Sequence, residues 1–197
     1  MECLIRVGLS ALLFCGVEIA CGQAAAVSNG GVPVVTVCEA LQDLSRYNGM
    51  VVIVVGRSGG TNEGSWLSED CERKIVTEGY TWANIISTAY GRSEVKPPPI
   101  LPADFRWDEA LLATKLKEIQ QITQLRIQKN HRYDDRWVAI FGRFEARLLL
   151  QVLVAGTGTL MGYGFGHGNQ APAQLISNFG EDYYELKPKK KQVRTSR

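Results

Sequence analysis

The spacing of hydrophobic positions changes along this chain, and each spacing predicts a different element. Residues 50–58, MVVIVVGRS, form a β-branched run typical of a buried strand. In residues 137–154, WVAIFGRFEARLLLQVLV, apolar side chains alternate with Glu145, Arg147 and Gln151. This period of two predicts a strand with one apolar face.

Two other segments have helical spacing. Thr36 and Glu39 form a capping-box pair at the start of TVCEALQDLSRYNG, a short helix that Asn48 and Gly49 end. Residues 108–128 contain helix formers and neither glycine nor proline, which predicts one long helix packed against the rest of the protein. Its broad apolar face consists of Leu112, Leu116, Ile119 and Ile122.

Short strands and breaks complete the pattern. EGSWLSED at 63–70 and YTWANIIS at 80–87 are predicted strands, whereas four prolines prevent a sheet in KPPPILP at 96–102. Glycine occupies every second position from 162 to 168, so this segment is expected to run back antiparallel after a turn at AGTGT. APAQLISNF, at 171–179, is the predicted last strand.

A Gly-Arg pair follows an apolar run twice, at Gly56 and at Gly142. Glycine inside a strand usually marks a bulge or a sharp bend, and two such bends favour a small closed barrel. With YNGMVVIVVGR, EGSWLSEDC and GYGFGHGNQAPAQL, the chain resembles small exported bacterial proteins of unassigned function. Their strand pattern is similar to an oligonucleotide/oligosaccharide-binding (OB) barrel. The resemblance covers most of residues 36–180 and implies five strands with a helical insertion, but no catalytic residue.

We therefore predict a mostly β (α+β) fold, a small OB-like antiparallel barrel with a short N-terminal helix and one long inserted helix. The expected organisation is a signal peptide at 1–26 and a single barrel domain at 27–186. A helical insertion is expected at about 96–135 and a disordered basic tail at 187–197.

The N-terminus predicts export to the periplasm or beyond the cell. MECLIR carries a positive charge, VGLSALLFCGV is an apolar run too short to span a bilayer, and AAA at 24–26 suits a signal peptidase. No later run is long enough for a transmembrane helix. Removing residues 1–26 leaves only Cys38 and Cys71 of the five cysteines. In an oxidising compartment a disulfide is the simplest expectation, with two buried thiols as the alternative.

Charge is distributed unevenly. The formal net charge of +2 becomes +3 without residues 1–26, and the tail from Lys187 to Arg197 holds six positive charges, leaving the body near −3. Such a tail can contact an anionic surface or polymer, such as lipid headgroups, cell-wall polymers or nucleic acid. A solvated end is the alternative reading, and the tail has no aromatic residue for base stacking.

One motif suggests an enzyme. GRSGG matches G-x-S-x-G, and Asp134 or Asp135 and then His167 follow Ser58 in the chain order of an α/β-hydrolase triad. A small serine hydrolase is therefore the alternative function. It requires a helix directly after Ser58, whereas TNEGSWLSED has turn formers and no helical period.

Neither a metal nor a nucleotide cofactor is expected. His131 and His167 are the only histidines, and neither has a second histidine or a cysteine at the spacing of a metal site. Asp134 and Asp135 follow His131 closely, but polar residues in a turn need no metal. The glycine-rich segment lacks G-x-G-x-x-G, and no Walker A sequence occurs.

The same segment supplies the candidate ligand face. In a strand, Tyr163, Phe165 and His167 would point to one side and the glycines to the other, where Phe144 or Trp137 could cover them. We expect the aromatic side to face the core, because contiguous exposed aromatics are uncommon. Facing outward, it would stack sugars or bases. The predicted function is a secreted, non-enzymatic binding or structural module of unknown ligand.

Overall fold

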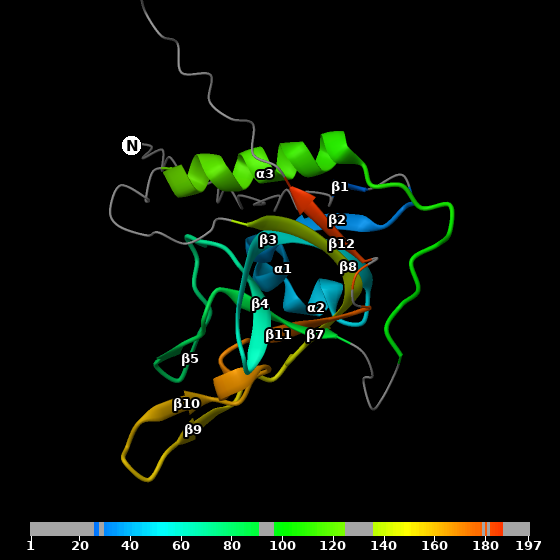
Figure 1. The fold of residues 1–197 in the computed structure, drawn as a ribbon. Helices are drawn as coiled ribbons and strands as arrows, with labels where there is room; N and C mark the ends of the chain where they lie inside the picture. The colour runs from blue at the N-terminus through cyan, green and yellow to red at the C-terminus, as the bar shows by residue number, and fades with distance from the viewer. Residues whose placement is uncertain are drawn as a thin grey trace, which may run out of the picture.

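The computed structural model describes residues 26–27, 30–90, 97–124, 136–178, 180 and 182–186, with side chains of the long helix described to residue 121. Its centre is a closed barrel of five strands (Figure 1). In order around the barrel these are β3 (Val51–Thr61), β4 (Gly64–Ser68), β7 (Ile85–Tyr90), β11 (Ala173–Ser177) and β8 (Trp137–Ala146). β8 pairs again with β3 and closes the ring. The mostly β prediction is confirmed, and the barrel is compatible with an OB-like fold.

Strand directions refine the prediction of an antiparallel barrel. Four of the five pairings are antiparallel, and β7 runs parallel to β11. The parallel pair arises because the chain crosses the barrel between β7 and β11, passing through the long helix and β8. The expected insertion therefore lies in the β7–β8 connection.

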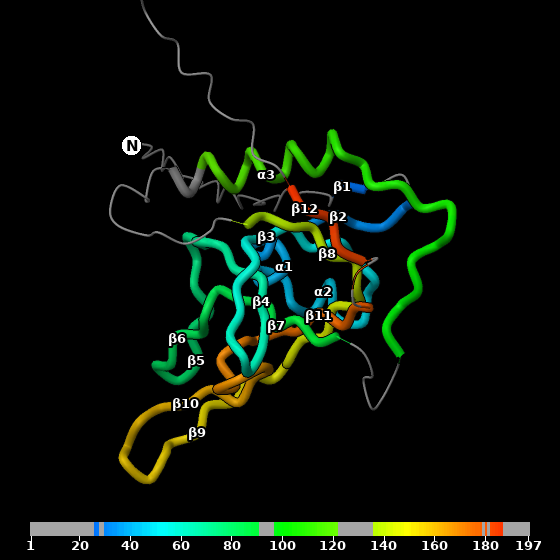
Figure 2. The backbone as a smooth tube through the Cα atoms, in the orientation of Figure 1, coloured from blue at the N-terminus to red at the C-terminus, as the bar shows by residue number. Residues whose placement is uncertain are grey.

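Further strands extend the barrel sheet or stand apart from it, as the tube in Figure 2 shows. β2 (Pro33–Thr36) pairs with the edge of β3, β1 (Ala26–Val27) pairs with β2, and β12 (Tyr183–Leu186) pairs with β8. None of these three strands is predicted by the sequence pattern. The segment 171–179, expected to be the last strand, is followed by β12. Two hairpins form separate small sheets: β5 (Val76–Thr77) with β6 (Tyr80–Thr81), and β9 (Val152–Val154) with β10 (Leu160–Gly162).

Two short helices occupy the interior side of the barrel. The predicted capping box is present, since Thr36 Oγ1 accepts from the N–H of Glu39 and the Glu39 carboxylate accepts from the N–H of Thr36. The single predicted helix is nevertheless two, α1 (Val37–Gln42) and α2 (Leu44–Tyr47). Asp43 separates them because its carboxylate caps α2 by accepting from the N–H of Arg46.

The barrel interior is filled by apolar side chains from all five strands and both short helices. β3 and β8 contribute every second residue, as a strand with one face inward must. The fully buried members include Val35, Val37, Ala40, Leu41, Tyr47, Val52, Val54, Leu67, Ile86, Val138, Ile140, Phe144, Ala173 and Leu175.

The outer face of β3 and β8 is also buried, because the long helix α3 (Glu109–Gln124) lies across it (Figure 1). This second cluster consists of Val34, Ile53, Val55, Phe105, Leu112, Leu116, Ile119, Trp137, Ala139, Phe141 and Leu186. The strand at 137–144 is therefore buried on both faces, whereas alternation predicted one apolar face. Leu112, Leu116 and Ile119 face the sheet as expected. The side chain of Ile122 lies outside the described residues.

The predicted strand at 137–154 ends early, at Ala146. Ala146 is paired with Ala173, the first residue of β11. The carbonyl of Pro172, just before β11, still accepts from the N–H of Arg147 at 3.0 Å, but proline has no N–H to return a bond and extend the ladder. Beyond this point Leu148 and Leu149 are exposed. The chain becomes a strand again only at β9.

The two Gly-Arg sites are close approaches rather than bulges. Gly56 and Gly142 both lie in continuous ladders, opposite Val138 and Val52. A Cβ at Gly56 would be 2.8 Å from a methyl carbon of Val37, and one at Gly142 would be 2.7 Å from a backbone oxygen on β11. These positions let α1 and β11 pack directly against the strands.

Several expectations concern other parts of the chain. Residues 1–25 of the expected signal peptide, residues 91–96 and 125–135, and the basic tail lie outside the described residues. Ala26, the last residue of that expected segment, is described and belongs to β1. Among the residues that are described, no helix combines the length and apolarity needed to cross a membrane.

Candidate functional site

A cavity of about 330 Å³ opens on the outer face of β4 and β7. Two connections border it, the β3–β4 turn at 61–64 and the glycine-rich segment at 163–171. Its lining residues are Thr61, Glu63, Gly64, Ser65, Trp66, Ala83, Ile85, Ser87, Phe165, Gly166, His167, Gln170 and Ala171. Side chains of the strands β4 and β7 thus line the same cavity as side chains of the two connections.

Trp66 provides the large ring on the strand side. It pairs with Gly59 across β3–β4 and with Ser87 across β4–β7. A Cβ on Gly59 would stand 2.5 Å from the Trp66 Nε1, so the absent side chain makes the room in which the indole lies. Opposite it lies Ser87, whose Oγ would be 2.7 Å from a Cβ on Gly166, so the glycine-rich segment approaches the strand there.

The glycine-rich segment is a sequence of turns rather than a strand. Regular pairing ends at Gly162, and the next backbone bonds join Tyr163 to Gln151 and Phe165 to Ala171. Gly166 and Gly168 both have φ of +72°, which glycine adopts without strain. Gly166 and Gly168 therefore mark tight turns and not the period of a sheet.

The ring that covers these glycines is Trp82, not Phe144 or Trp137. A Cβ on Gly162 would be 2.8 Å from the Trp82 ring, and one on Gly164 would be 2.9 Å from it. Trp82 is almost completely buried, and Tyr80 packs edge-on against it at 5.1 Å between centroids. The segment is thereby held against the body of the protein.

An ion pair bridges the two bordering connections. His167 Nε2 lies 2.8 Å from Glu63 Oε2, and both side chains are more than half exposed. The pair carries charge on both sides only when His167 is protonated. It ties the β3–β4 turn to the glycine-rich segment at the rim of the cavity.

The predicted aromatic face is divided by the turns. Phe165 is half-buried and lines the cavity, and His167 stands at the rim. Tyr163 is 46% exposed, so the expectation that it belongs to the core is wrong. The guanidinium of Arg147 lies over both rings, 4.5 Å from the Phe165 centroid and 5.4 Å from that of Tyr163.

Ser58 has a different environment from the one a hydrolase requires. It lies inside β3, opposite Leu67, so its side chain is on the interior side of the barrel. Its backbone N–H donates to the carbonyl of Arg136 at 2.8 Å. The strand continues to Thr61 with no turn into a helix, so the strained elbow of that mechanism is absent at Ser58. Asp134, Asp135 and His131 lie outside the described residues.

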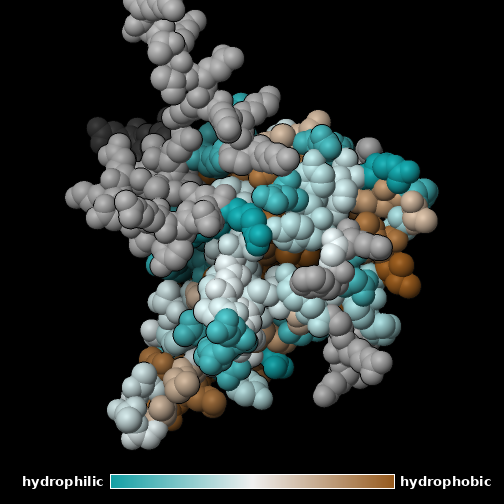
Figure 3. Space-filling view, in the orientation of Figure 1, coloured by the Kyte–Doolittle hydropathy of each residue, from teal (hydrophilic) through white to brown (hydrophobic). Residues whose placement is uncertain are grey.

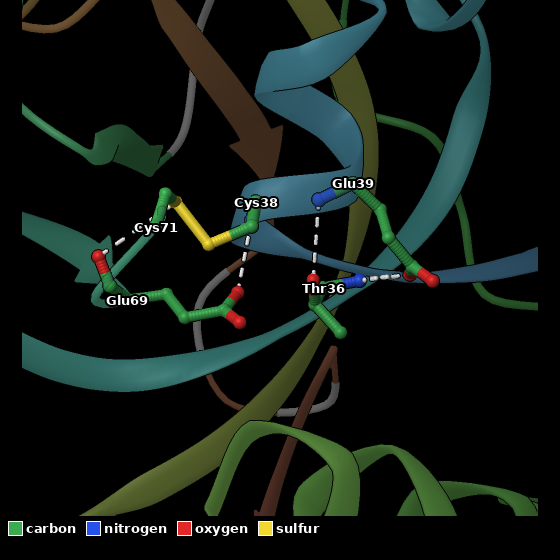
Figure 4. The surroundings of a disulfide bond; sticks show 5 residues. All are labelled: Thr36, Cys38, Glu39, Glu69 and Cys71. Atoms are coloured by element: carbon green, nitrogen blue, oxygen red, sulfur yellow. Dashed lines mark hydrogen bonds between the residues drawn. A yellow bond between two sulfur atoms is a disulfide. The ribbon is translucent and has the colours of Figure 1, made fainter. Parts of the chain in front are cut away.

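The two predicted cysteines form a disulfide away from the cavity (Figure 4). Cys38 of α1 and Cys71, after β4, have Cα atoms 5.4 Å apart. Beside them Glu69 is buried and accepts from the N–H of Cys38. Burial raises the pKa of the Glu69 carboxyl, and the bonds from Cys38 and Thr36 oppose that rise. The carboxylate and both sulfur atoms lie within 4.8 Å of one another, but bonded sulfurs are not thiolate ligands.

A larger hollow, of about 950 Å³, lies between α3 and β12. Its one aromatic lining residue is Tyr184, whose hydroxyl bonds to Glu109. The remaining lining comes from α3, including Lys117 and Gln120, and from Glu185 and Leu186 of β12. This hollow has one aromatic ring, whereas Trp66, Phe165 and His167 line the cavity over β4 and β7, which is the better candidate for that reason.

Sequence reasoning identified Phe165 and His167 but missed Trp66, Glu63 and Gln170. Only the three-dimensional closure of the barrel brings the β3–β4 turn beside a segment a hundred residues later. The signal available in the sequence was the pair Gly59 and Trp66 on either side of a tight turn. Comparison with known proteins adds no name to this site: no family model, no curated protein and no solved structure matches the chain.

Proposed function

We propose that the protein is an exported, non-catalytic binding module that holds a neutral, hydroxyl-rich polymer, a glycan segment, across the outer face of β4 and β7. The observation that carries this proposal is the cavity between the β3–β4 turn and the glycine-rich segment. In OB barrels the second and third strands and the two flanking loops are the usual ligand surface, and β4 and β7 hold those places here.

The chemistry of the lining supports a sugar. Trp66 and Phe165 supply apolar ring surface for the C–H face of a pyranose. Glu63 offers a carboxylate that accepts hydrogen bonds from sugar hydroxyls, and Ser87 and Gln170 offer a hydroxyl and an amide that both donate and accept them. A cavity of about 330 Å³ is at the lower end of ligand sites and suits one or two sugar rings of a longer chain.

Charge argues against a nucleic acid at this place. Among the described lining residues there is neither lysine nor arginine, and His167 is paired with Glu63. Phosphate polymers are bound mainly through such cations, and the nearby guanidinium of Arg147 lies over the Phe165 and Tyr163 rings and is not part of the lining. A neutral ligand needs no such neutralisation.

The export in this proposal rests on two supports. Residues 1–26 have the layout of a signal peptide, and the Cys38–Cys71 disulfide is typical of oxidising compartments. The basic tail, Lys187 to Arg197, would add contact with an anionic polymer or surface. That contact stays a separate prediction.

Titration calorimetry tests the proposal. Short oligomers of N-acetylglucosamine, of glucose and of thymidylate are titrated into the secreted protein, and into the variants Trp66→Ala and Trp107→Ala. Both tryptophans are half-buried, but Trp107 packs with Phe105 and Tyr184 away from the cavity. We expect a glycan to bind and Trp66→Ala alone to weaken it by about tenfold or more. Binding of thymidylate only, or equal losses in both variants, would contradict the proposal.

A further inference from the structure

The β9–β10 hairpin projects from the barrel and carries exposed hydrophobic side chains. In Figure 1 it extends from the lower left of the body, and hydrophobic atoms cover much of it in Figure 3. From Leu148 to Gly166 the sequence contains no Asp, Glu, Lys or Arg. The turn at its tip, AGTGT, consists of small uncharged residues. A charge-free, apolar projection of this kind marks a site of interaction.

Both faces of the hairpin are apolar. On one face Val154 is 69% exposed, opposite its partner Leu160 at 38%. On the other face Leu153 is 54% exposed, opposite Met161 at 47%. A protein docked on one face would leave the other pair in water. An apolar phase that surrounds the hairpin would cover the side chains of both faces at once.

The root of the hairpin has a different chemistry. Tyr163 pairs there with Gln151 and is exposed, and the guanidinium of Arg147 lies over its ring. The Nε of Arg147 is buried and has no hydrogen-bond partner among the described residues. Tyrosine and arginine are the side chains that sit at the level of lipid headgroups, where the ring is half-apolar and the cation meets phosphate.

We propose that this hairpin inserts into a phospholipid surface, with Leu153, Val154 and Met161 among the acyl chains and Arg147 against headgroup phosphates. From the Tyr163–Gln151 pair to the tip the hairpin spans about 15 Å at the rise of a β-strand. A headgroup layer is roughly 5–8 Å thick on each side of a bilayer, so the tip reaches the hydrocarbon. The positive Arg147 complements anionic lipid. The six positive charges of the tail from Lys187 to Arg197 add to this attraction, whereas the body between residue 26 and the tail has a net charge near −3.

Flotation with vesicles of phosphatidylethanolamine and phosphatidylglycerol tests this proposal. The protein is secreted by the host cell, and its N-terminus is determined by mass spectrometry, so that every variant begins at the same residue. We expect the parent to float with the vesicles, and Leu153→Ser/Val154→Ser to need about tenfold more lipid. Because both positions are exposed, this variant should melt like the parent. Arg147→Lys should bind better than Arg147→Gln.

The matched control is Met50→Ser/Ile100→Ser, which removes two exposed apolar side chains elsewhere and should float like the parent. A Leu153→Trp variant should shift its emission to the blue on adding vesicles. Three results would overturn the proposal: a parent that does not float, a hairpin variant that floats as well as the parent, or equal losses in the control. A concentration-dependent dimer that Leu153→Ser/Val154→Ser dissociates, without vesicle binding, would instead assign the hairpin to a second copy.

Discussion

The carboxylate of Glu69 accepts a hydrogen bond from the backbone N–H of Cys38, with 2.8 Å between Oε2 and N and a sequence separation of 31. The bond places a carboxylate at the N-terminal end of α1, where unpaired N–H groups favour negative charge. Cys38 is also bonded to Cys71, two residues after Glu69. The end of β4 and the start of α1 are thus joined twice.

This relationship predicts the pH dependence of a Glu69→Gln variant. Burial, the largest influence, raises the pKa of Glu69 above its ordinary value of 4.5, so the folded protein holds its proton more tightly than the unfolded chain. The resulting stability is present below 4.5 and is lost as the pH rises through the folded pKa. Urea unfolding should therefore show the parent losing stability relative to Glu69→Gln as the pH rises. A parent that gains on the variant would reverse the sign and refute the assignment.

The disulfide should contribute a large part of the stability. Replacing Cys38 and Cys71 together by alanine opens a loop with a sequence separation of 33 residues. The chain-entropy relation gives a loss of about 4 kcal/mol for a loop of that size. Urea unfolding of the double variant, with non-reducing peptide mapping of the parent, measures it. Freely alkylated thiols in the parent would show that no such bond forms.

Two aromatic residues beside the glycine-rich segment should behave differently. Trp82 is 1% exposed and fills the space above Gly162 and Gly164, so Trp82→Ala should cost about 3–5 kcal/mol of unfolding free energy. Tyr163→Ala should cost about 1 kcal/mol or less, because the ring is exposed and mainly contacts Arg147. Thermal and urea unfolding compare the two. Similar losses would mean that Tyr163 is core after all.

A fluorophosphonate probe should leave Ser58 unmodified. The residue lies within a continuous strand, on the interior side of the barrel, and lacks the strained turn that activates a hydrolase serine. Mass spectrometry of the treated protein gives the answer. Covalent labelling at Ser58, lost in Ser58→Ala, would favour the serine hydrolase with Asp134 or Asp135 and His167.

The sequence predicted local features better than long-range ones. The capping box of Thr36 and Glu39 and the buried strand at 51–58 depend on neighbouring residues, and both are confirmed. The barrel was inferred from Gly56 and Gly142, although each glycine serves close packing instead of a bulge. The short strands β1, β2 and β12 were missed because two to four residues carry no readable period.

The candidate site was only partly predictable, for a physical reason. Alternating glycines in 162–168 match the period of a strand, but positive φ at Gly166 and Gly168 turns the chain. The glycines also fit close contacts with residues distant in sequence, since Trp82 lies against Gly162 and Gly164, and Ser87 against Gly166. Trp66 joins the site for the same reason, since its place depends on Gly59 of the neighbouring strand. The spacing of residue types along the sequence does not predict contacts between residues so far apart.

Nuclear magnetic resonance tests most directly whether a glycan binds in the cavity over β4 and β7, because shifts of the backbone amide signals map the binding site. Oligomers of N-acetylglucosamine and of glucose are added to the isotope-labelled protein. The proposal predicts that the shifted amides cluster in the β3–β4 turn with Trp66, around Ser87, and from Phe165 to Ala171. A spectrum that does not change with either glycan, or shifts confined to the hollow between α3 and β12, would contradict it.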